Sequence, residues 1–228
     1  MKRRHYSGIT LIEMLVSIAI ASLLLLITLQ VISRSYVNWR RESTRTQLQT
    51  NTKTAVETVA QVIRSAKSVE AQNSQPDSHA PNPENPYSWT SAADSGATLI
   101  LAVPARDASG NIIYIDATHT SLYTDNVIFY LEPNTDILYR RTIANTVAPN
   151  NATTTTCPPA QSTPACPPDS KVVADIANLT TTYLDASGNV VASPSGTEAV
   201  RYELSQTRSI GSQMFESSYG TTATLRNK

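Results

Sequence analysis

Residues 9–33 read ITLIEMLVSIAIASLLLLITLQVIS, and this stretch decides the fold of the 228-residue chain. From Met14 to Ser33 it contains 20 uncharged residues, about the length of an α-helix that crosses the ~30 Å hydrocarbon core of a bilayer. Twelve of these residues are Leu, Ile or Val, and each stabilises an inserted helix by roughly 0.3–0.6 kcal/mol at the bilayer centre. We therefore expect residues 9–33 to form a membrane-spanning helix.

The helical pattern continues beyond this stretch. Apolar residues recur at three- and four-residue spacing over Ala55–Ala66, and the other face of the helix carries polar residues such as Thr, Gln and Glu. No proline precedes Pro76, and no glycine lies between Gly8 and that proline. The sequence thus predicts a single helix that is apolar on all sides over 9–33 and amphipathic over 34–75.

Prolines cluster where this helix is expected to end. Four of them lie between Pro76 and Pro86, and a proline disfavours helix in the residue before it, so residues 76–97 are predicted to form a linker. Beyond the linker the apolar period changes from 3.6 to 2, which is typical of strands. The strands predicted for a β-rich head at 98–228 are Thr98–Val103, Ile112–Ile115, Val127–Leu131, Ile137–Ile143, Ala177–Leu184, Val190–Ala192, Ala199–Leu204 and Thr222–Leu225.

Two copies of the pentapeptide Asp-Ala-Ser-Gly-Asn, at 107–111 and 185–189, predict hairpin turns. Asp and Ser side chains bond to nearby backbone in such turns, and Gly readily adopts a positive φ. Residues 132–136, Glu-Pro-Asn-Thr-Asp, predict a third turn. A calcium loop is the alternative, but neither pentapeptide has the series of oxygen ligands found in an EF-hand.

Cys157 and Cys166 lie in a Pro- and Thr-rich loop at 145–169 and are separated by eight residues. In an oxidising compartment such a pair is expected to form a disulfide, which would contribute roughly 2.5–3 kcal/mol on the chain-entropy model. The spacing fits neither a CxxC redox motif nor a zinc site. A pair of free thiols is the alternative.

The sequence contains no recognisable catalytic motif, because GxSxG, P-loop and HExxH patterns are all absent. His79 and His119 have no cysteine beside them in the sequence. We therefore expect no enzyme activity, no metal site and no cofactor. The 18 basic and 18 acidic residues balance, so a DNA contact through exposed tyrosines and the Arg140-Arg141 pair has little electrostatic support, and strand packing with a solvated edge is the favoured interpretation.

Three interpretations of the N-terminal segment remain open on these residues. It can be a permanent signal anchor. It can be a signal peptide that is cleaved after Ala19-Ile20-Ala21, which fits the small-x-small rule, although the apolar run continues to Ile32 and Glu13 would lie within it. It can also be cleaved after Gly8, directly before the apolar stretch.

A short basic leader, residues 1–8, supports the third interpretation. Its positive charges are Lys2, Arg3 and Arg4. Together with this leader, residues 8–16, GITLIEMLV, resemble the class III signal of type IV pilins and type II secretion pseudopilins. The resemblance implies that a prepilin peptidase in the bacterial inner membrane cleaves between Gly8 and Ile9 and N-methylates Ile9. It also implies a single-pass protein with a cytoplasmic N-terminus and a periplasmic head.

Glu13 is the one charged residue in the apolar stretch. A carboxylate is costly in lipid, so an intramembrane Glu predicts a cationic partner. In the resembling family this partner is the N-terminal amine of a neighbouring subunit, here the amine of Ile9, and the pair fixes the register of packing. The competing interpretation is that Glu13 only complements the N-terminal dipole of its own helix.

The resemblance also implies a fold and a function. The fold is α+β and pilin-like, with the long helix packed on an antiparallel β-sheet head. The segments VIFYL (127–131), ILYRRT (137–142) and TTATLRN (221–227) are similar to PilW-type minor pilins and J-type pseudopilins. A minor pilin of this type takes part in a priming or tip complex of a type IV pilus, for adhesion, motility or DNA uptake.

The partners implied are the prepilin peptidase, the major pilin, other minor pilins, the inner-membrane assembly platform and membrane lipid. The first alternative function is a J-type pseudopilin of a type II secretion system, which would join a pseudopilus. The second alternative is a membrane-anchored adhesin or DNA-binding receptor that does not polymerise.

Overall fold

The computed structural model describes residues 10–91, 98–132, 135–211 and 213–226. The chain divides into two compact units, of which the first ends at Thr46 and the second begins at Gln47. The helix α1, Leu11–Ser65, contributes residues to both units.

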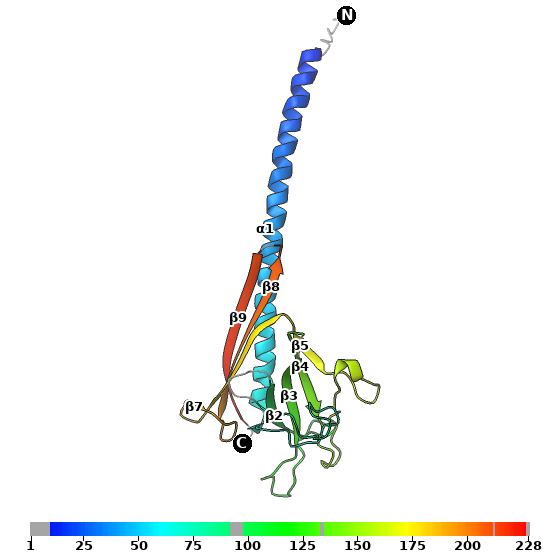
Figure 1. Cartoon of the computed structure of the whole chain (residues 1–228), viewed down its shortest axis with the longest axis vertical. Helices are drawn as coiled ribbons and strands as arrows, with labels where there is room; N and C mark the ends of the chain where they lie inside the picture. Colours follow the sequence, from blue (N-terminus) through cyan, green and yellow to red (C-terminus); the bar gives the residue numbers. More distant parts are fainter. Residues whose placement is uncertain (1–9, 92–97, 133–134, 212, 227–228) are drawn as a thin grey trace, which may run out of the picture. The chain divides into compact units, whose positions relative to one another are not determined.

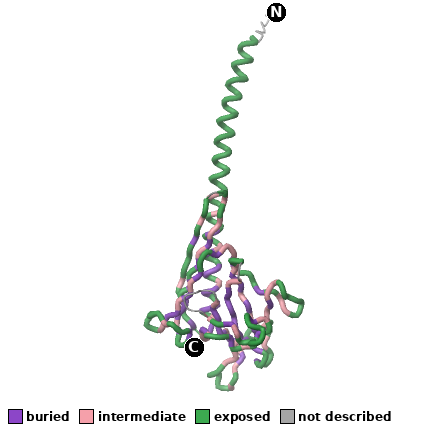
Figure 2. The backbone as a smooth tube through the Cα atoms, viewed as in Figure 1, coloured by how far each residue is buried: buried purple, intermediate pink, exposed green. Residues whose placement is uncertain are grey.

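α1 is one helix of 55 residues, as the lack of internal glycine and proline predicts. In the first unit, its apolar side chains from Leu11 to Ile32 are more than half exposed, and this part of the backbone is coloured as exposed in Figure 2. In the second unit one face of α1 is buried. The residues of that face are Leu48, Thr52, Ala55, Val56, Val59, Ala60, Val62 and Ile63.

α1 ends at Ser65, ten residues before the end predicted for the amphipathic segment 34–75. The N–H of Lys67 donates to the carbonyl of Ala102 (2.8 Å), and residues Ser68–Glu70 form strand β1. This strand buries Val69 in the core. The helix therefore stops where the backbone begins to pair with a sheet, and the prolines after residue 75 do not mark its end.

The first sheet has five antiparallel strands in the order β1-β2-β3-β4-β5. After β1 they are β2 Thr98–Pro104, β3 Thr124–Glu132, β4 Ile137–Ile143 and β5 Ser170–Val173. One face of this sheet packs against α1 through side chains such as Leu101 and Phe129. The opposite face is also covered, because Ile128 and Tyr130 pack with Trp89.

The second sheet has four antiparallel strands in the order β7-β6-β8-β9. They are β6 Ile176–Leu184, β7 Val190–Val191, β8 Ala199–Ile210 and β9 Gln213–Thr224. Figure 1 shows β8 and β9 alongside the part of α1 that belongs to the second unit. Thr52 of α1 donates its hydroxyl to the side-chain oxygen of Gln206 in β8 (2.8 Å), and both residues are buried. The predicted α+β class, with a long helix packed on antiparallel sheets, is confirmed.

The predicted strands differ from the observed ones in three main ways. Residues 112–115 form only isolated bridges to neighbouring loops, so the strand predicted there is wrong. β1 and β5, of three and four residues, were not predicted. The last hairpin is longer than predicted, because β8 continues to Ile210 and β9 begins at Gln213 through polar residues that show no apolar alternation.

Both Asp-Ala-Ser-Gly-Asn segments form the predicted turns. Gly110 and Gly188 have φ values of 85° and 81°, which favour glycine. The carboxylates of Asp107 and Asp185 each accept backbone N–H groups two and four residues further on. These aspartates therefore stabilise the turns themselves. The turn predicted at 132–136 includes residues 133 and 134, which lie outside the described residues.

Candidate functional site

α1 begins with a capping box formed by Thr10 and Glu13. The backbone N–H and the hydroxyl of Thr10 donate to Oε2 of Glu13 at 2.8 and 3.1 Å, and the N–H of Glu13 donates to the Thr10 hydroxyl at 3.3 Å. This reciprocal arrangement satisfies N–H groups that have no partner within the helix. Oε1 of Glu13 accepts no hydrogen bond from any residue that the structure describes. The carboxylate thus serves its own helix with one oxygen and leaves the other exposed.

The remaining residues predicted for the N-terminal site precede the described residues. They are Lys2, Arg3, Arg4, Gly8 and Ile9. Cleavage after Gly8, methylation of Ile9 and the role of the leader charges therefore stay predictions.

The apolar stretch of α1 is long and apolar enough to cross a membrane, by length and composition. Tyr36 and Trp39 follow it with ring centroids 6.2 Å apart, and Arg40 and Arg41 come next. Aromatic rings and basic residues in this order are typical of a helix at a membrane–water interface. This aromatic pair was not singled out in the sequence. Its position directly after the apolar run, which ends at Ser33, could have indicated a role at the interface.

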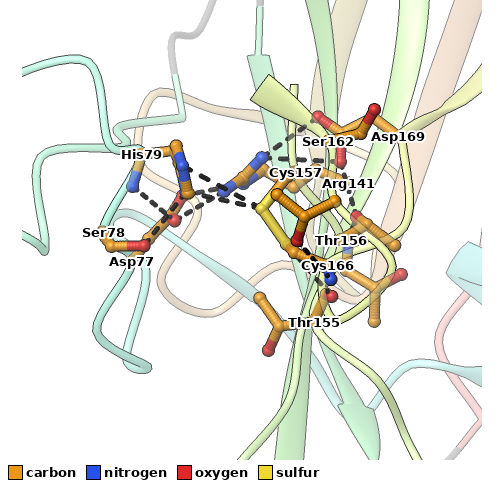
Figure 3. The surroundings of a disulfide bond; sticks show 12 residues. Asp77, Ser78, His79, Arg141, Thr155, Thr156, Cys157, Ser162, Cys166 and Asp169 are labelled. Atoms are coloured by element: carbon orange, nitrogen blue, oxygen red, sulfur yellow. Dashed lines mark hydrogen bonds and ion pairs between the residues drawn. A yellow bond between two sulfur atoms is a disulfide. The ribbon is translucent and has the colours of Figure 1, made fainter. Parts of the chain in front are cut away.

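A buried ion-pair cluster lies in the second unit, around Arg141 of β4 (Figure 3). The guanidinium donates to both carboxylate oxygens of Asp77, from Nε at 2.7 Å and from Nη2 at 2.6 Å. It also donates from Nη1 to Oδ2 of Asp169 at 3.1 Å. All three side chains are 0% exposed. The cluster joins the segment after α1, the first sheet and the residue before β5.

Neutral donors complete the cluster. Trp89 donates its indole N–H to Asp77 (2.7 Å), and the N–H of His79 donates to the same carboxylate (2.9 Å). Tyr130 and Thr156 donate their hydroxyls to Asp169 at 2.8 and 2.5 Å. Buried charges that are paired and hydrogen-bonded in this way hold their neighbours in one arrangement, whereas loss of one partner is strongly destabilising.

The charges in the cluster support one another. Burial alone raises the pKa of Asp77, but the hydrogen bonds from Arg141, His79 and Trp89 outweigh it and hold that pKa below its ordinary value of 3.8. Burial lowers the pKa of Arg141, yet the contacts with Asp77 and Asp169 raise it overall. Burial and the hydrogen bond to Asp169 raise the pKa of Tyr130. Pairing therefore dominates desolvation at Asp77 and Arg141.

The structure contains a disulfide between Cys157 and Cys166, with the two Cα atoms 5.6 Å apart. The N–H of Asp169 donates to the carbonyl of Cys157 (2.7 Å), so the disulfide lies directly beside the ion-pair cluster. A nitrogen of the His79 ring lies 3.6 Å from Sγ of Cys157, as Figure 3 shows. The loop 145–169, which includes the short 3-10 helix Pro159–Gln161, is thus held against the segment after α1.

Burial in the second unit corrects three interpretations of the sequence. Arg141 is buried and paired, so it is neither a DNA contact nor part of a solvated strand edge. Four of the tyrosines that were expected to be exposed are buried, namely Tyr130, Tyr139, Tyr183 and Tyr202. The described part of the predicted linker at 76–97 also packs against the first sheet, because Asp77 and Trp89 are both buried in contact with that sheet.

We expect the contribution of Asp77 to stability to depend on pH. Its pKa is lowered in the folded state, so the contribution is fully present above the ordinary Asp value and is lost as the pH falls through the folded pKa. Replacing Asp77 with Asn should cost about 3 kcal/mol at pH 7. Urea unfolding of the wild type and Asp77→Asn from pH 7 to 2 should show a constant gap down to about pH 5 and a narrowing gap below pH 3.8. A gap that closes between pH 7 and 5 would contradict this assignment.

Comparison with known protein families finds one match near the N-terminus. The family described as "Prokaryotic N-terminal methylation motif" matches residues 3–29. The match includes Arg3 and Arg4 of the basic leader, the Gly8–Ile9 bond, the Thr10–Glu13 capping box and most of the apolar stretch. A comparison with curated proteins finds no match. Among the described residues, no group of three or more His, Cys, Asp or Glu side chains is placed to hold a metal ion.

Proposed function

Because the chain carries the prokaryotic N-terminal methylation motif, which supports a type IV prepilin or pseudopilin family, we propose that it is a minor pilin. In this proposal it is stored in a membrane and then joins a type IV pilus, as part of a priming or tip complex. The observation that carries the proposal is the overlap of the motif at 3–29 with the start of a 55-residue helix that is long and apolar enough to span a bilayer.

Processing follows from the position of the motif. A prepilin peptidase would cleave the Gly8–Ile9 bond and methylate the new amine of Ile9. Glycine suits the position before the bond because it has no Cβ to obstruct a confined protease site. The bond lies directly before the Thr10–Glu13 capping box, so cleavage would leave both residues of the capping box in the mature chain.

Membrane position follows from the two ends of the apolar stretch. The prepilin peptidase would meet the leader on the cytoplasmic side, and Tyr36 and Trp39 would lie at the opposite interface of the inner membrane. The second unit would then lie in the periplasm. The disulfide between Cys157 and Cys166 supports this orientation, because disulfides persist in oxidising compartments such as the periplasm.

Assembly would use the free oxygen of Glu13. Among the described residues, the carboxylate accepts hydrogen bonds only from Thr10, through Oε2. An α-ammonium on Ile9 of a neighbouring subunit is the cation that processing creates at the same depth of the membrane. A salt bridge between these groups would neutralise a charge that is costly in lipid, and it would fix the register between neighbouring helices.

Two variants of Glu13 separate this role from helix capping. Gln at the third helical position still accepts in a capping box, but it has no charge. We expect Glu13→Gln and Glu13→Ala both to enter the membrane and to be processed. Both should lower the amount of this chain in sheared pili at least about tenfold, because neither can pair with an ammonium in lipid. Immunoblots of the pilus and membrane fractions measure the ratio.

The comparison of the two variants decides the outcome. If Glu13→Gln assembles normally and Glu13→Ala does not, the carboxylate acts only through its own helix and the proposed pairing is wrong. If the wild-type chain itself never appears in the sheared fraction, the chain is not a pilus subunit. Glu57, which pairs with Lys53 on an exposed face of α1, provides the control variant Glu57→Gln, which should assemble as the wild type does.

A further inference from the structure

Four arginines follow the apolar stretch of α1 within twelve positions. They are Arg34, Arg40, Arg41 and Arg45, which we call the arginine collar. Glu42 is the one acidic residue over 34–45, so four basic residues against one acidic residue give this segment a net charge of +3. Residues 46–228 have the opposite balance, because 11 basic residues against 16 acidic residues give a net charge of −5. Positive charge is therefore concentrated directly after the apolar stretch.

The guanidinium groups of the arginine collar are open to a partner from outside the chain. Three of the four residues are exposed and Arg41 is partly buried, on the part of the helix that Figure 2 colours mostly as exposed. Among the residues that the structure describes, none of the four guanidinium groups makes a hydrogen bond or an ion pair. The exposed carboxylate of Glu42 is not paired with them either. Their charge is thus not neutralised within the described chain.

Helix geometry places the arginine collar at the level of lipid headgroups. The 20 uncharged residues that end at Ser33 are long enough to fill the ~30 Å hydrocarbon core, and Tyr36 and Trp39 follow as interfacial aromatic residues. Arg40 lies about 10 Å beyond Ser33 at 1.5 Å per residue. Because Cα–Cβ bonds in a helix tilt toward its N-terminus, the side chains of Arg40 and Arg41 extend back toward the apolar stretch and so toward the headgroups.

Phosphate is the anion that these residues fit. All four cations of the collar are arginines and none is a lysine, and a guanidinium group binds phosphate through two parallel N–H donors. Arg34, Arg41 and Arg45 are spaced by seven and four residues, so they lie on one face of α1, whereas Arg40 lies on another side of the helix. The collar can therefore contact headgroups on more than one side of the helix.

We propose that the arginine collar binds the phosphates of anionic phospholipids around the end of the apolar stretch. A zwitterionic headgroup carries a cation beside its phosphate, so a segment with a net charge of +3 favours lipids with a net negative charge. The inference rests on the membrane storage in the proposed function. It holds for either orientation of the span, because phospholipid headgroups are present at both surfaces of a bilayer.

A second copy of the chain is a poorer partner for the collar. Two copies that are anchored by the same apolar stretch lie at the same depth, where each offers the carboxylate of Glu42 against four guanidinium groups. Glu13 lies about 30 Å from Arg34 along the helix, on the far side of the apolar stretch. Pairing of two collars would therefore bring together more like charges than opposite charges, whereas anionic lipid adds only negative charge.

Quenching of Trp39 fluorescence tests the proposal in a bilayer. The full-length chain is reconstituted into phosphatidylcholine vesicles with a fixed fraction of labelled lipid, which is either phosphatidylglycerol or phosphatidylcholine with a nitroxide near the head of one acyl chain. Trp89 is the other tryptophan and is buried in the second unit, so Trp39→Phe measures its contribution for subtraction. We expect labelled phosphatidylglycerol to be enriched around Trp39 at least about threefold over labelled phosphatidylcholine. Equal quenching by the two lipids would contradict the proposal.

A matched set of variants assigns the lipid preference to the collar. The double variant Arg40→Gln, Arg41→Gln removes the two cations next to Trp39 and should lower the enrichment to less than about 1.5-fold. Arg64→Gln is the control, since Arg64 is an exposed arginine in the last turn of the same helix, and it should keep the wild-type enrichment. An enrichment that the double variant keeps, or that Arg64→Gln loses equally, would overturn the proposal. Flotation with the vesicles and an intact disulfide show that each variant is inserted and folded.

Three other outcomes separate the alternatives. If inorganic phosphate displaces labelled phosphatidylglycerol and chloride at the same ionic strength does not, the collar binds free phosphate and the assignment to lipid is wrong. If the two lipids quench equally and the emission of Trp39 changes with the ratio of protein to lipid, a second copy covers the collar and the inference is overturned. If the chain does not float with the vesicles, membrane storage fails and the inference fails with it, whereas insertion without a lipid preference overturns the inference alone.

Discussion

Replacing Arg141 with Met is expected to lower the free energy of unfolding of the second unit by about 3–5 kcal/mol. The substitution leaves the carboxylates of Asp77 and Asp169 buried without their cation. It also loosens the segment after α1 and the disulfide loop, because both are attached to the first sheet through this guanidinium. Few single substitutions have effects of this size, and those that do commonly break a buried network.

The neighbouring Arg140 is the matched control. It lies on the same strand, but its Nε is buried without a hydrogen-bond partner in the described part of the chain, and burial lowers its pKa. Arg140→Met should therefore change the free energy of unfolding by less than about 1 kcal/mol. Urea unfolding of the full chain in detergent, followed by fluorescence of the buried Trp89, measures both variants. Equal losses for the two variants would show that the ion pairs have no special role.

Replacing Gly8 with Leu is expected to prevent removal of the leader. A branched side chain next to the scissile bond would obstruct a protease site that accepts a residue without a Cβ. The product should keep the eight leader residues, remain in the membrane and be absent from sheared pili. A loss of assembly is expected because the amine that would pair with Glu13 of a neighbour is never formed.

Mass spectrometry of the purified Gly8→Leu protein measures the retained leader directly. Ser7→Leu is the matched control, since it adds the same side chain one residue further from the bond, and it should be processed. Normal processing of Gly8→Leu would contradict cleavage at this bond. Failure of both variants would show that the leader is sensitive to bulk in general.

The long helix and most of the sheet strands could be predicted because their patterns are local. The apolar run, the missing breakers and the period-two alternation each depend on residues close in sequence. Strand β4 begins and ends at Ile137 and Ile143, as predicted. The turn at Gly188 was predictable for the same reason, since one pentapeptide contains both the side chain that bonds to the backbone and the residue that adopts positive φ.

The ion-pair cluster could not be predicted, because its members are far apart in sequence. Arg141 lies 64 residues from Asp77 and 28 from Asp169, and no local pattern connects them. Two adjacent arginines in a strand did carry a signal, since side chains alternate between the two faces of a sheet. Arg140 and Arg141 therefore face opposite sides of the first sheet. Because both sides of this sheet are covered, a buried arginine needs a partner of opposite charge.

The helix end and the length of the last hairpin were missed for different reasons. α1 ends because Lys67 pairs with β2, which is a tertiary contact that overrides helical pattern. Half of the 12 residues of β9 are Ser, Thr or Gly, and the strand has no apolar alternation that would reveal it. Its length is set by the register with β8.

The mass of the mature N-terminal peptide tests the central claim most directly. The full chain is purified from the membrane of its native host, digested, and its N-terminal peptide is sequenced by mass spectrometry. The account predicts that this peptide begins at Ile9 and carries one methyl group on its amine. A peptide that begins at Met1 would indicate a permanent signal anchor, and one that begins at Ser22 would indicate a conventional secreted protein; either result would contradict the account.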